Sequence, residues 1–390
     1  MKKTIKVLWL CSWYPSSIIP RVGIFVQQQA QATYKFTDIA LIHAIGDKSL
    51  GKGYRVETNI EPYTVTRIYY PATRNPFVKV WRMFQAYKKG YGVVKNGWGQ
   101  PDLIHLHVLY PAGIFGWYLN LKERIPFVIT EHRAGYMHKG GSYRGIGMKL
   151  FTRLTFWRSQ YALPISNTFR DALINHGLKT RFKVVPNMVD TDSFNLTKSA
   201  DLTRHTKPFR FLHVGALFDK QKNQMGIIRA AAHLAERRSD FEVHIVGAGE
   251  DRERLIAIAT NLNVLEKYVF FDGYVPHNQI SDAFKKSDAF VLFSNMEGSP
   301  CVILEAMACG MPIIATETGG INERVTKQTG ILLQIGDENG LVEAMNYMID
   351  NKDKYDPSVI RQKIVEKCSV EAVGQAISDV YKEVLANTKR

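Results

Sequence analysis

The stretch that decides the fold runs from Phe290 to Ala315 and reads FVLFSNMEGSPCVILEAMACGMPIIA. Its first part, up to Ser294, is an apolar run bounded by polar residues, which predicts a buried strand. Ser299 suits the N-cap of a following helix, and Pro300 suits the first helical position, where a missing N–H costs nothing. The stretch therefore predicts a strand, a short loop and the start of a helix.

Two carboxylates lie around this predicted helix start. Glu297 and Glu305 have seven residues between them, which places Glu297 on the loop and Glu305 in the second helical turn. A helix that opens at the carboxyl end of a strand presents free backbone N–H groups and a positive dipole end, and both favour a phosphate. One carboxylate then reaches a sugar hydroxyl beside a diphosphate, and the other reaches a ribose. The stretch predicts a nucleotide-sugar site.

This arrangement closely resembles the E-x7-E region of the family 4 retaining glycosyltransferases of the GT-B fold, also called group 1. The resemblance continues through residues 308–312 and 318–323 and covers nearly the whole chain. It implies that Glu297 contacts the donor sugar, that Glu305 holds the ribose and that intervening amides hold the diphosphate. The intervening residues thereby assigned to substrate binding are Gly298, Ser299, Pro300, Cys301 and Val302.

A second part of the predicted site follows the apolar run Phe211–Val214. Members of the family usually place an arginine just after the next glycine and a lysine six residues later, both aimed at the donor diphosphate. Here Lys222 matches the second position, whereas Ala216 replaces the arginine. The resemblance therefore leaves open whether Lys220 supplies the missing contact. Asn223, the next residue, is also assigned to substrate binding.

Two elements of the first half resemble further parts of the family's site. Gly23 lies in the loop after the first predicted strand, where a glycine lets backbone approach a phosphate closely. Thr130-Glu131-His132 matches a T-E-H element whose histidine approaches the donor sugar. The resemblance thus assigns His132 to catalysis together with Glu297 and Lys222. In the second half, residues 274–278 resemble the segment whose backbone faces the nucleotide base.

No motif predicts a metal or a cofactor. Asp190-Thr-Asp192 mimics the D-x-D metal element of a different glycosyltransferase fold, but it lies in a segment that resembles an interdomain region of this family. His105 and His107 are interpreted as facing opposite sides of one strand, so that they do not share a metal. Four cysteines show neither C-x-x-C nor Cys/His spacing and are interpreted as reduced packing residues: Cys11, Cys301, Cys309 and Cys368.

Short apolar runs alternate with longer helical patterns along the chain, which predicts an α/β protein with two doubly wound, Rossmann-like parallel sheets. The polar segment 195–208 is interpreted as a linker between an acceptor-side domain, 1–195, and a donor-binding domain, 205–370. The resemblance implies that the C-terminal helix, 371–390, packs back on the first domain, and its amphipathic pattern equally allows packing on the second. The predicted strands are Lys6–Leu10, Ile39–His43, Val65–Tyr69, Leu103–His105, Phe127–Thr130, Tyr161–Ile165, Phe182–Val185, Phe211–Val214, Glu242–Val246, Val269–Phe271, Ala289–Phe293 and Pro312–Ala315.

Charge is divided unevenly along the chain. The formal net charge is +15, with 28 Lys and Arg against 10 Asp and Glu in residues 1–200 and 23 against 26 in the remainder. No nucleic-acid motif accompanies this basic half, so an anionic membrane surface or a lipid-linked phosphate acceptor is the favoured partner. Segments 75–89 and 148–158 mix aromatic and basic residues at helical spacing, as interfacial helices do. Two ordinary helices with aromatic core faces and solvated basic faces explain that pattern equally well.

These features predict a metal-independent, retaining glycosyltransferase without a cofactor. It would move a sugar from a nucleotide-sugar, either a UDP-sugar or GDP-mannose, to a hydroxyl of a carbohydrate or lipid-linked acceptor in cell-surface polysaccharide or glycolipid synthesis. The expected location is the cytoplasm, with peripheral attachment to the inner face of the membrane. Two alternatives stay open, namely a nucleotide-sugar epimerase on the same scaffold and a non-catalytic nucleotide-sugar sensor.

Overall fold

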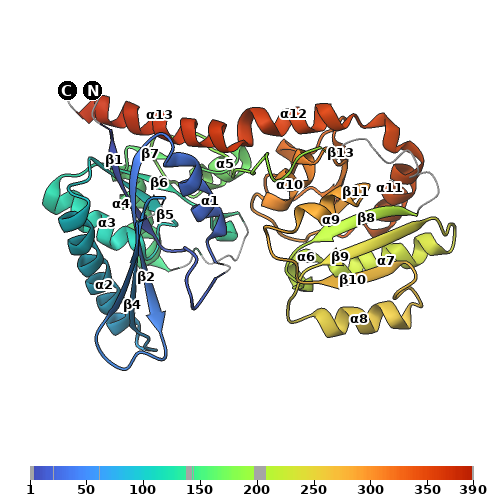
Figure 1. Ribbon diagram of the computed structural model, residues 1–390, viewed down its shortest axis with the longest axis horizontal. Helices are drawn as coiled ribbons and strands as arrows, with labels where there is room; N and C mark the ends of the chain where they lie inside the picture. The colour runs from blue at the N-terminus through green and yellow to red at the C-terminus, as the bar shows by residue number, and fades with distance from the viewer. Residues whose placement is uncertain are drawn as a thin grey trace. The chain divides into compact units, whose positions relative to one another are not determined.

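The structure is a computed structural model that describes residues 4–20, 22–60, 62–137, 143, 145–196 and 208–388. It contains two compact units (Figure 1), one formed by Met1–Met188 with Val370–Arg390 and the other by Val189–Ser369. Most of the segment 195–208, which the sequence suggested as a linker, lies outside the described residues.

The first unit is built on a seven-stranded sheet with the order β3-β4-β2-β1-β5-β6-β7. All neighbouring strands in it pair in parallel except β3, which pairs antiparallel with β4. Its strands are β1 (Lys6–Cys11), β2 (Asp38–Asp47), β3 (Arg55–Asn59), β4 (Thr64–Pro71), β5 (Leu103–His107), β6 (Phe127–Thr130) and β7 (Tyr161–Ala162).

Helices cover both faces of this sheet, because its central strands are apolar on both sides. In β1, Leu8 and Leu10 belong to a core shared with α2, α3, α4 and α5, whereas Val7 and Trp9 belong to a core shared with α1 and α13. The helices of this unit are α1 (Ile24–Thr33), α2 (Pro76–Gly97), α3 (Ala112–Glu123), α4 (Ile146–Arg158), α5 (Asn167–Asn175) and α13 (Val370–Thr388).

The last helix, α13, completes the second of these cores. Its residues Val373, Ile377 and Val384 are buried, and Gly374 brings it so close to α1 that an added Cβ would lie 2.3 Å from the Ala32 carbonyl oxygen. Apolar side chains recur along one side of the helix, and this side packs against the first unit. The first unit is therefore made from the two ends of the chain.

The second unit is built on a six-stranded sheet with the order β10-β9-β8-β11-β12-β13, parallel throughout. The chain adds β9 and β10 on one side of β8 and then returns to add β11, β12 and β13 on the other. The strand order therefore reverses between β8 and β11, which is where open α/β sheets form their ligand crevice. Its strands are β8 (Phe209–Val214), β9 (Phe241–Val246), β10 (Val269–Gly273), β11 (Ala289–Leu292), β12 (Ile313–Thr316) and β13 (Gly330–Leu333).

Helices lie on both sides of this sheet as well, as Figure 1 shows for α7 and α10. The largest part of the core consists of branched aliphatic and aromatic residues from the six strands and from these helices. The helices of the unit are α6 (Asp219–Lys222), α7 (Gln224–Ala235), α8 (Arg252–Asn261), α9 (Ser281–Lys285), α10 (Cys301–Ala308), α11 (Glu338–Asn351) and α12 (Pro357–Cys368).

The predicted class of fold, with two parallel α/β sheets, is confirmed. Several details differ, and the predicted strand Tyr161–Ile165 is shortened to Tyr161–Ala162. Strands β3 and β13 were not predicted, and the predicted strand Phe182–Val185 is reduced to an isolated bridge between Ala162 and Phe182. Within the described part of the chain, no helix combines the length and the apolar character that crossing a membrane requires.

Candidate functional site

The two central residues of the predicted donor site meet at the switch point of the second sheet. Lys222 follows β8, and Glu297 follows β11. Lys222 Nζ lies 2.7 Å from Glu297 Oε1, and the Ser294 hydroxyl donates a hydrogen bond of 2.7 Å to the same oxygen. Both charged side chains are largely buried, with side-chain exposures of 15% for the lysine and 6% for the glutamate. The switch point thus holds a charge pair that is shielded from solvent.

The loop that carries Glu297 is fixed through its backbone. The Glu297 N–H donates to Thr318 Oγ1 at 3.3 Å, and the Gly320 N–H donates to the Gly298 carbonyl at 2.7 Å. Gly319 has a φ of 62°, and an added Cβ would lie 2.5 Å from the Glu297 carbonyl oxygen. Only glycine fits such a position without strain. The segment after β12 therefore clamps the carboxylate loop.

The helix that follows begins one residue later than predicted. Pro300 is the N-cap, in an extended conformation, and α10 begins at Cys301, so the expected Ser299 cap with Pro300 as first helical residue is wrong. Glu305, 5% exposed, lies within this helix. The five residues assigned to diphosphate and donor contacts form the end of the loop and the first helical turn: Gly298, Ser299, Pro300, Cys301 and Val302.

Glu305 has a partner that the sequence did not reveal. His277 Nε2 lies 2.9 Å from Glu305 Oε1. The hydrogen bond that His277 donates to the Glu305 carboxylate raises the pKa of His277 above its ordinary value, against the opposing effect of burial. Residues 274–278 were expected to act through their backbone, and no spacing rule links a histidine to a carboxylate 28 residues away. His277 therefore joins the second carboxylate of the site as a hydrogen-bond donor whose charged form Glu305 stabilises.

This pair predicts a pH-dependent contribution to stability. Because the pKa of His277 is raised in the folded state, its contribution is complete below about pH 6.5, the ordinary histidine value, and is lost as pH rises through the raised pKa. We expect the melting-temperature difference between the wild type and His277→Gln to shrink as pH rises from 6 to 8. The decrease should follow the titration of a single group. His233→Gln, an exposed histidine outside the site, serves as the matched control. A difference that does not change with pH would contradict this role.

The remaining predicted donor residues lie around α6. Asn223 ends this short helix in a left-handed conformation with φ 48°, and its side chain accepts a 3.2 Å hydrogen bond from the Gly226 N–H, which caps α7. Lys220 and Ala216 are both exposed. The Asn223 side chain is thus engaged in helix capping, whereas the Lys222 side chain turns toward the carboxylate loop.

The first unit brings the other two predicted residues near each other. Gly23 precedes α1 with a φ of 81°, and an added Cβ would lie 2.6 Å from the backbone of Trp13 and Tyr14. Phe25, in the first turn of α1, contacts the ring of His132, with centroids 4.3 Å apart. Burial lowers the pKa of His132 to about 4, so the imidazole is neutral at physiological pH. It can therefore act as a hydrogen-bonding group but not as a cation.

The residue before this histidine organises the loop in a way that the T-E-H pattern alone did not show. Glu131 is 1% exposed and accepts hydrogen bonds from the backbone N–H groups of Leu109, His132 and Arg133. The Arg133 guanidinium adds an ion pair at 3.1 Å and donates to the Tyr136 hydroxyl at 2.7 Å. One buried carboxylate thus ties the loops after β5 and β6 together beneath His132.

The two histidines of β5 lie on the same side of the strand, so the expectation that they face opposite sides is wrong. Residues two apart in a strand share a face, and the rings of His105 and His107 have centroids 3.9 Å apart. His105 bonds to the hydroxyls of Tyr381 and Thr130, and His107 stacks on Trp9. Both imidazoles are fully buried, and they belong to the packing between the sheet and α13.

Among the residues that the structure describes, no group of three or more His, Cys, Asp or Glu side chains is placed to hold a metal ion. The D-x-D segment forms a local turn instead. Asp190 accepts hydrogen bonds from the backbone N–H groups of Asp192 and Ser193 and from the Ser193 hydroxyl. Its carboxylate is therefore occupied by its own loop.

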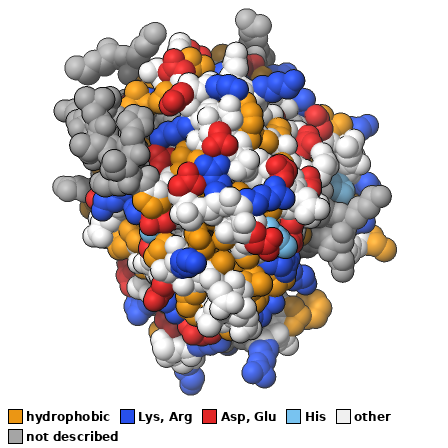
Figure 2. Space-filling model, turned by 90° about the vertical axis from the view of Figure 1, so that its right-hand side faces the viewer, with side chains coloured by type: hydrophobic (Ala, Val, Ile, Leu, Met, Phe, Trp, Pro, Cys, Tyr) orange, Lys and Arg blue, Asp and Glu red, His pale blue; other side chains and the backbone are white. Residues whose placement is uncertain are grey.

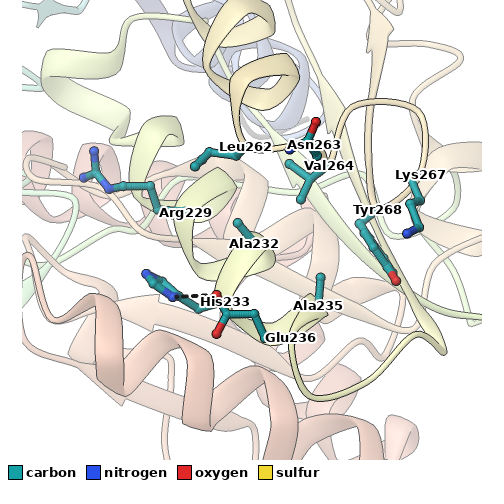
Figure 3. Close-up of a pocket in the computed structure, with 10 residues that line it drawn as sticks. All are labelled: Arg229, Ala232, His233, Ala235, Glu236, Leu262, Asn263, Val264, Lys267 and Tyr268. Atoms are coloured by element: carbon teal, nitrogen blue, oxygen red, sulfur yellow. Dashed lines mark ion pairs between the residues drawn. The ribbon is translucent and has the colours of Figure 1, made fainter.

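A hollow of about 350 Å³ lies elsewhere in the second unit (Figure 3). It is lined by residues at the ends of α7 and α8 and at the start of β10, among them His233, Leu262 and Tyr268. Helix ends of this kind lie at the amino edge of a parallel sheet, opposite the carboxyl edge where Lys222 and Glu297 meet. The side chains in Figure 3 include no pair of carboxylates, so this hollow does not match the predicted donor site.

Comparison with solved structures agrees with this geometry. The UDP complex of HepE from Anabaena matches with a TM-score of 0.75 and 19% identity, covering 98% of this chain and 100% of that one. The same protein has been solved with UDP-glucose. The two α/β units are those of the GT-B class of glycosyltransferases.

Sequence comparison narrows the class. Residues 42–193 match the family described as Glycosyltransferase Family 4, and residues 194–363 match the one described as Glycosyl transferases group 1. The chain therefore belongs to the family 4 glycosyltransferases, and the resemblance recognised in the E-x7-E region is confirmed.

Two curated relatives illustrate the range of the family. TuaC of Bacillus subtilis, described as a candidate glycosyltransferase of teichuronic acid biosynthesis, is 27% identical over 365 residues, which cover 87% of this chain and 88% of TuaC. An Escherichia coli protein described as UDP-Gal:alpha-D-GlcNAc-diphosphoundecaprenol alpha-1,3-galactosyltransferase is 31% identical over 218 residues, covering 53% of this chain and 55% of that one.

Proposed function

We propose that this glycosyltransferase moves a sugar from a nucleotide-sugar, a UDP-sugar or GDP-mannose, to a hydroxyl of a carbohydrate or lipid-linked acceptor in cell-surface polysaccharide or glycolipid synthesis. The observation that carries the proposal is the buried Lys222–Glu297 pair at the switch point, beside the N-terminal turn of α10. HepE, solved with UDP-glucose, and the E. coli relative named for UDP-Gal support a UDP-sugar as donor. The diphosphoundecaprenol acceptor in that relative's name supports a lipid-linked acceptor.

The proposed mechanism begins with a change of partner. A nucleotide diphosphate carries negative charge that competes with Glu297 for Lys222, so donor binding replaces the ion pair by a lysine–phosphate contact. The backbone N–H groups at the start of α10 add a second positive field on the diphosphate. Glu297, released from the lysine, then accepts hydrogen bonds from the donor sugar. Glu305 holds the ribose, with His277 orienting its carboxylate.

Transfer then requires that the site stabilise a departing diphosphate and an oxocarbenium-like sugar. Lys222 and the α10 amides supply preorganised positive charge for the first, which lowers the barrier because no solvent has to reorganise. Attack of the acceptor hydroxyl on the same face as the leaving group retains the anomeric configuration. In this proposal the leaving phosphate oxygen takes the acceptor proton, so neither a side-chain base nor a metal ion is required.

The proposal is tested by a donor panel followed by a transfer assay. We expect a UDP-sugar to raise the melting temperature, since a ligand of the native state stabilises it, and transfer to a lipid-diphosphate sugar acceptor to continue in EDTA with an α-configured product from an α-configured donor. Loss of transfer that Mg²⁺ or Mn²⁺ restores would overturn the metal-free step. Turnover of the donor without any acceptor would identify an epimerase, and binding without turnover on every acceptor would identify a sensor.

A further inference from the structure

A row of apolar side chains stands in solvent along α4. Ile146, Leu150, Leu154 and Trp157 are 88%, 56%, 41% and 70% exposed. Their spacing of four, four and three residues places them on one side of the helix. The residues that α4 buries lie on the other side of the helix: Thr152, Thr155 and Phe156. The exposed row therefore takes no part in the hydrophobic core.

The start of α2 carries two more exposed aromatic residues. Phe77 is 84% exposed and Trp81 is 61% exposed, and they are four residues apart on the same side of the helix. Both helices belong to the layer that shares one core with α3 on a single face of the sheet. The α2–α4 surface, defined by Phe77 and Trp81 with the four exposed apolar residues of α4, thus belongs to one helical layer of the first unit.

The charged side chains in the two segments that carry this surface are all basic. Residues 62–101 contain seven Lys and Arg and no Asp or Glu, and residues 132–170 contain the same numbers. Lys88 on α2 and Lys149 and Arg153 on α4 are exposed. On the second unit, by contrast, Figure 2 shows Lys, Arg, Asp and Glu side chains interspersed. The α2–α4 surface therefore combines exposed aromatic residues with charge of a single sign.

We infer that the α2–α4 surface docks on an anionic lipid bilayer. Exposed tryptophan, phenylalanine and leucine residues insert at the boundary between headgroups and acyl chains, and neighbouring basic residues are attracted by anionic headgroups. A second copy of this chain would bring its own cations to the same place, and an acidic protein would leave the aromatic residues without a matching apolar phase. The inference deepens the proposed function, on which it rests only for the nature of the acceptor, because a lipid-linked acceptor is met at such a surface.

The test is flotation of the full-length protein with vesicles, without donor or acceptor. We expect binding to phosphatidylcholine vesicles that contain about 30% phosphatidylglycerol, little binding to pure phosphatidylcholine, and loss of binding when salt rises to about 0.5 M. Because no sugar transfer is involved, failure of this test would leave the proposed reaction standing, and failure of the transfer assay would leave the docking surface standing.

Two double variants separate the contributions of charge and of insertion. Lys149→Glu/Arg153→Glu is expected to weaken partitioning onto anionic vesicles at least ~10-fold, and Leu150→Ser/Trp157→Ser by a similar factor. Lys327→Glu/Lys367→Glu, the same charge change at exposed sites of the second unit, should leave vesicle binding unchanged. Unchanged melting temperatures show that each variant is folded. Equal binding to neutral and anionic vesicles, no binding to either at low salt, or wild-type binding by both test variants would overturn the inference.

Discussion

Glu297→Gln is expected to lower kcat at least ~10²-fold while the protein keeps its affinity for the nucleotide or gains some. The glutamine amide preserves the volume of the side chain and can still accept from Ser294, so the loop should keep its shape. It no longer pairs with Lys222, which lies 2.7 Å from the carboxylate, and the lysine is then available to the diphosphate before the donor arrives. A fall in kcat without a rise in Kd is the signature of an interaction that matters in the transition state.

The experiment compares kcat for sugar transfer, Kd for UDP and the melting temperature in the wild type and in Glu297→Gln. The glutamine is preferable to alanine because Glu297 is buried, 4% exposed, and alanine would leave a cavity and remove the oxygen that accepts from Ser294. Glu338→Gln, which removes a carboxylate from another ion pair of the second unit, is the matched control. A folded Glu297→Gln protein with near-normal kcat would refute the assignment of this carboxylate to the donor sugar.

Lys222→Ala is expected to lower kcat by about 10²-fold and to weaken UDP binding as well, because the lysine would contact the diphosphate both in the bound donor and in the transition state. This joint effect distinguishes the lysine from Glu297. In the double variant Lys222→Ala/Glu297→Gln, the loss of transition-state stabilisation should be smaller than the sum of the losses in the two single variants. The reason is that the two side chains contact each other and act on one donor.

The neighbouring Lys220→Ala is the control for this second result. Lys220 is exposed on the same short helix, so both variants remove one positive charge within three residues. We expect Lys220→Ala to keep more than about half of the wild-type kcat, within the small effect usual for a surface charge. If Lys220→Ala were the damaging change and Lys222→Ala were not, the lysine of the family pattern would have been placed at the wrong residue.

Most of the parallel strands were predictable because they are buried on both faces. Such strands read as near-continuous apolar runs, and β1, β6 and β11 are examples. The missed strand β3, with the sequence RVETN, lies at an edge and is largely exposed, so it has no apolar run to detect. Segment 182–185 lies beside β7, which has only two residues. The segment therefore forms a single bridge and not a strand.

Local motifs of the site were predictable to within a residue, and long-range pairs were not. The start of α10 was misplaced by one position because proline tolerates both the extended N-cap and the first helical turn. His277 escaped notice because its partner Glu305 is brought to it by the packing of the sheet and not by local spacing. The error over His105 and His107 was of a different kind, since strand periodicity itself places residues two apart on one face.

The two-ended construction of the first unit has a consequence for how the protein is made. Residues 1–188 leave the ribosome well before α13, which together with α1 covers one face of their sheet and is encoded after the entire second unit. Protein synthesis adds about 5–20 residues per second, so this face remains without α13 for on the order of ten seconds or more. The second unit, contiguous in the chain, can close its own core during that interval. We therefore expect the nascent first half to depend on chaperones, and chains truncated before α13 to be recognised by cellular quality control even though the donor-side residues of the second unit are intact.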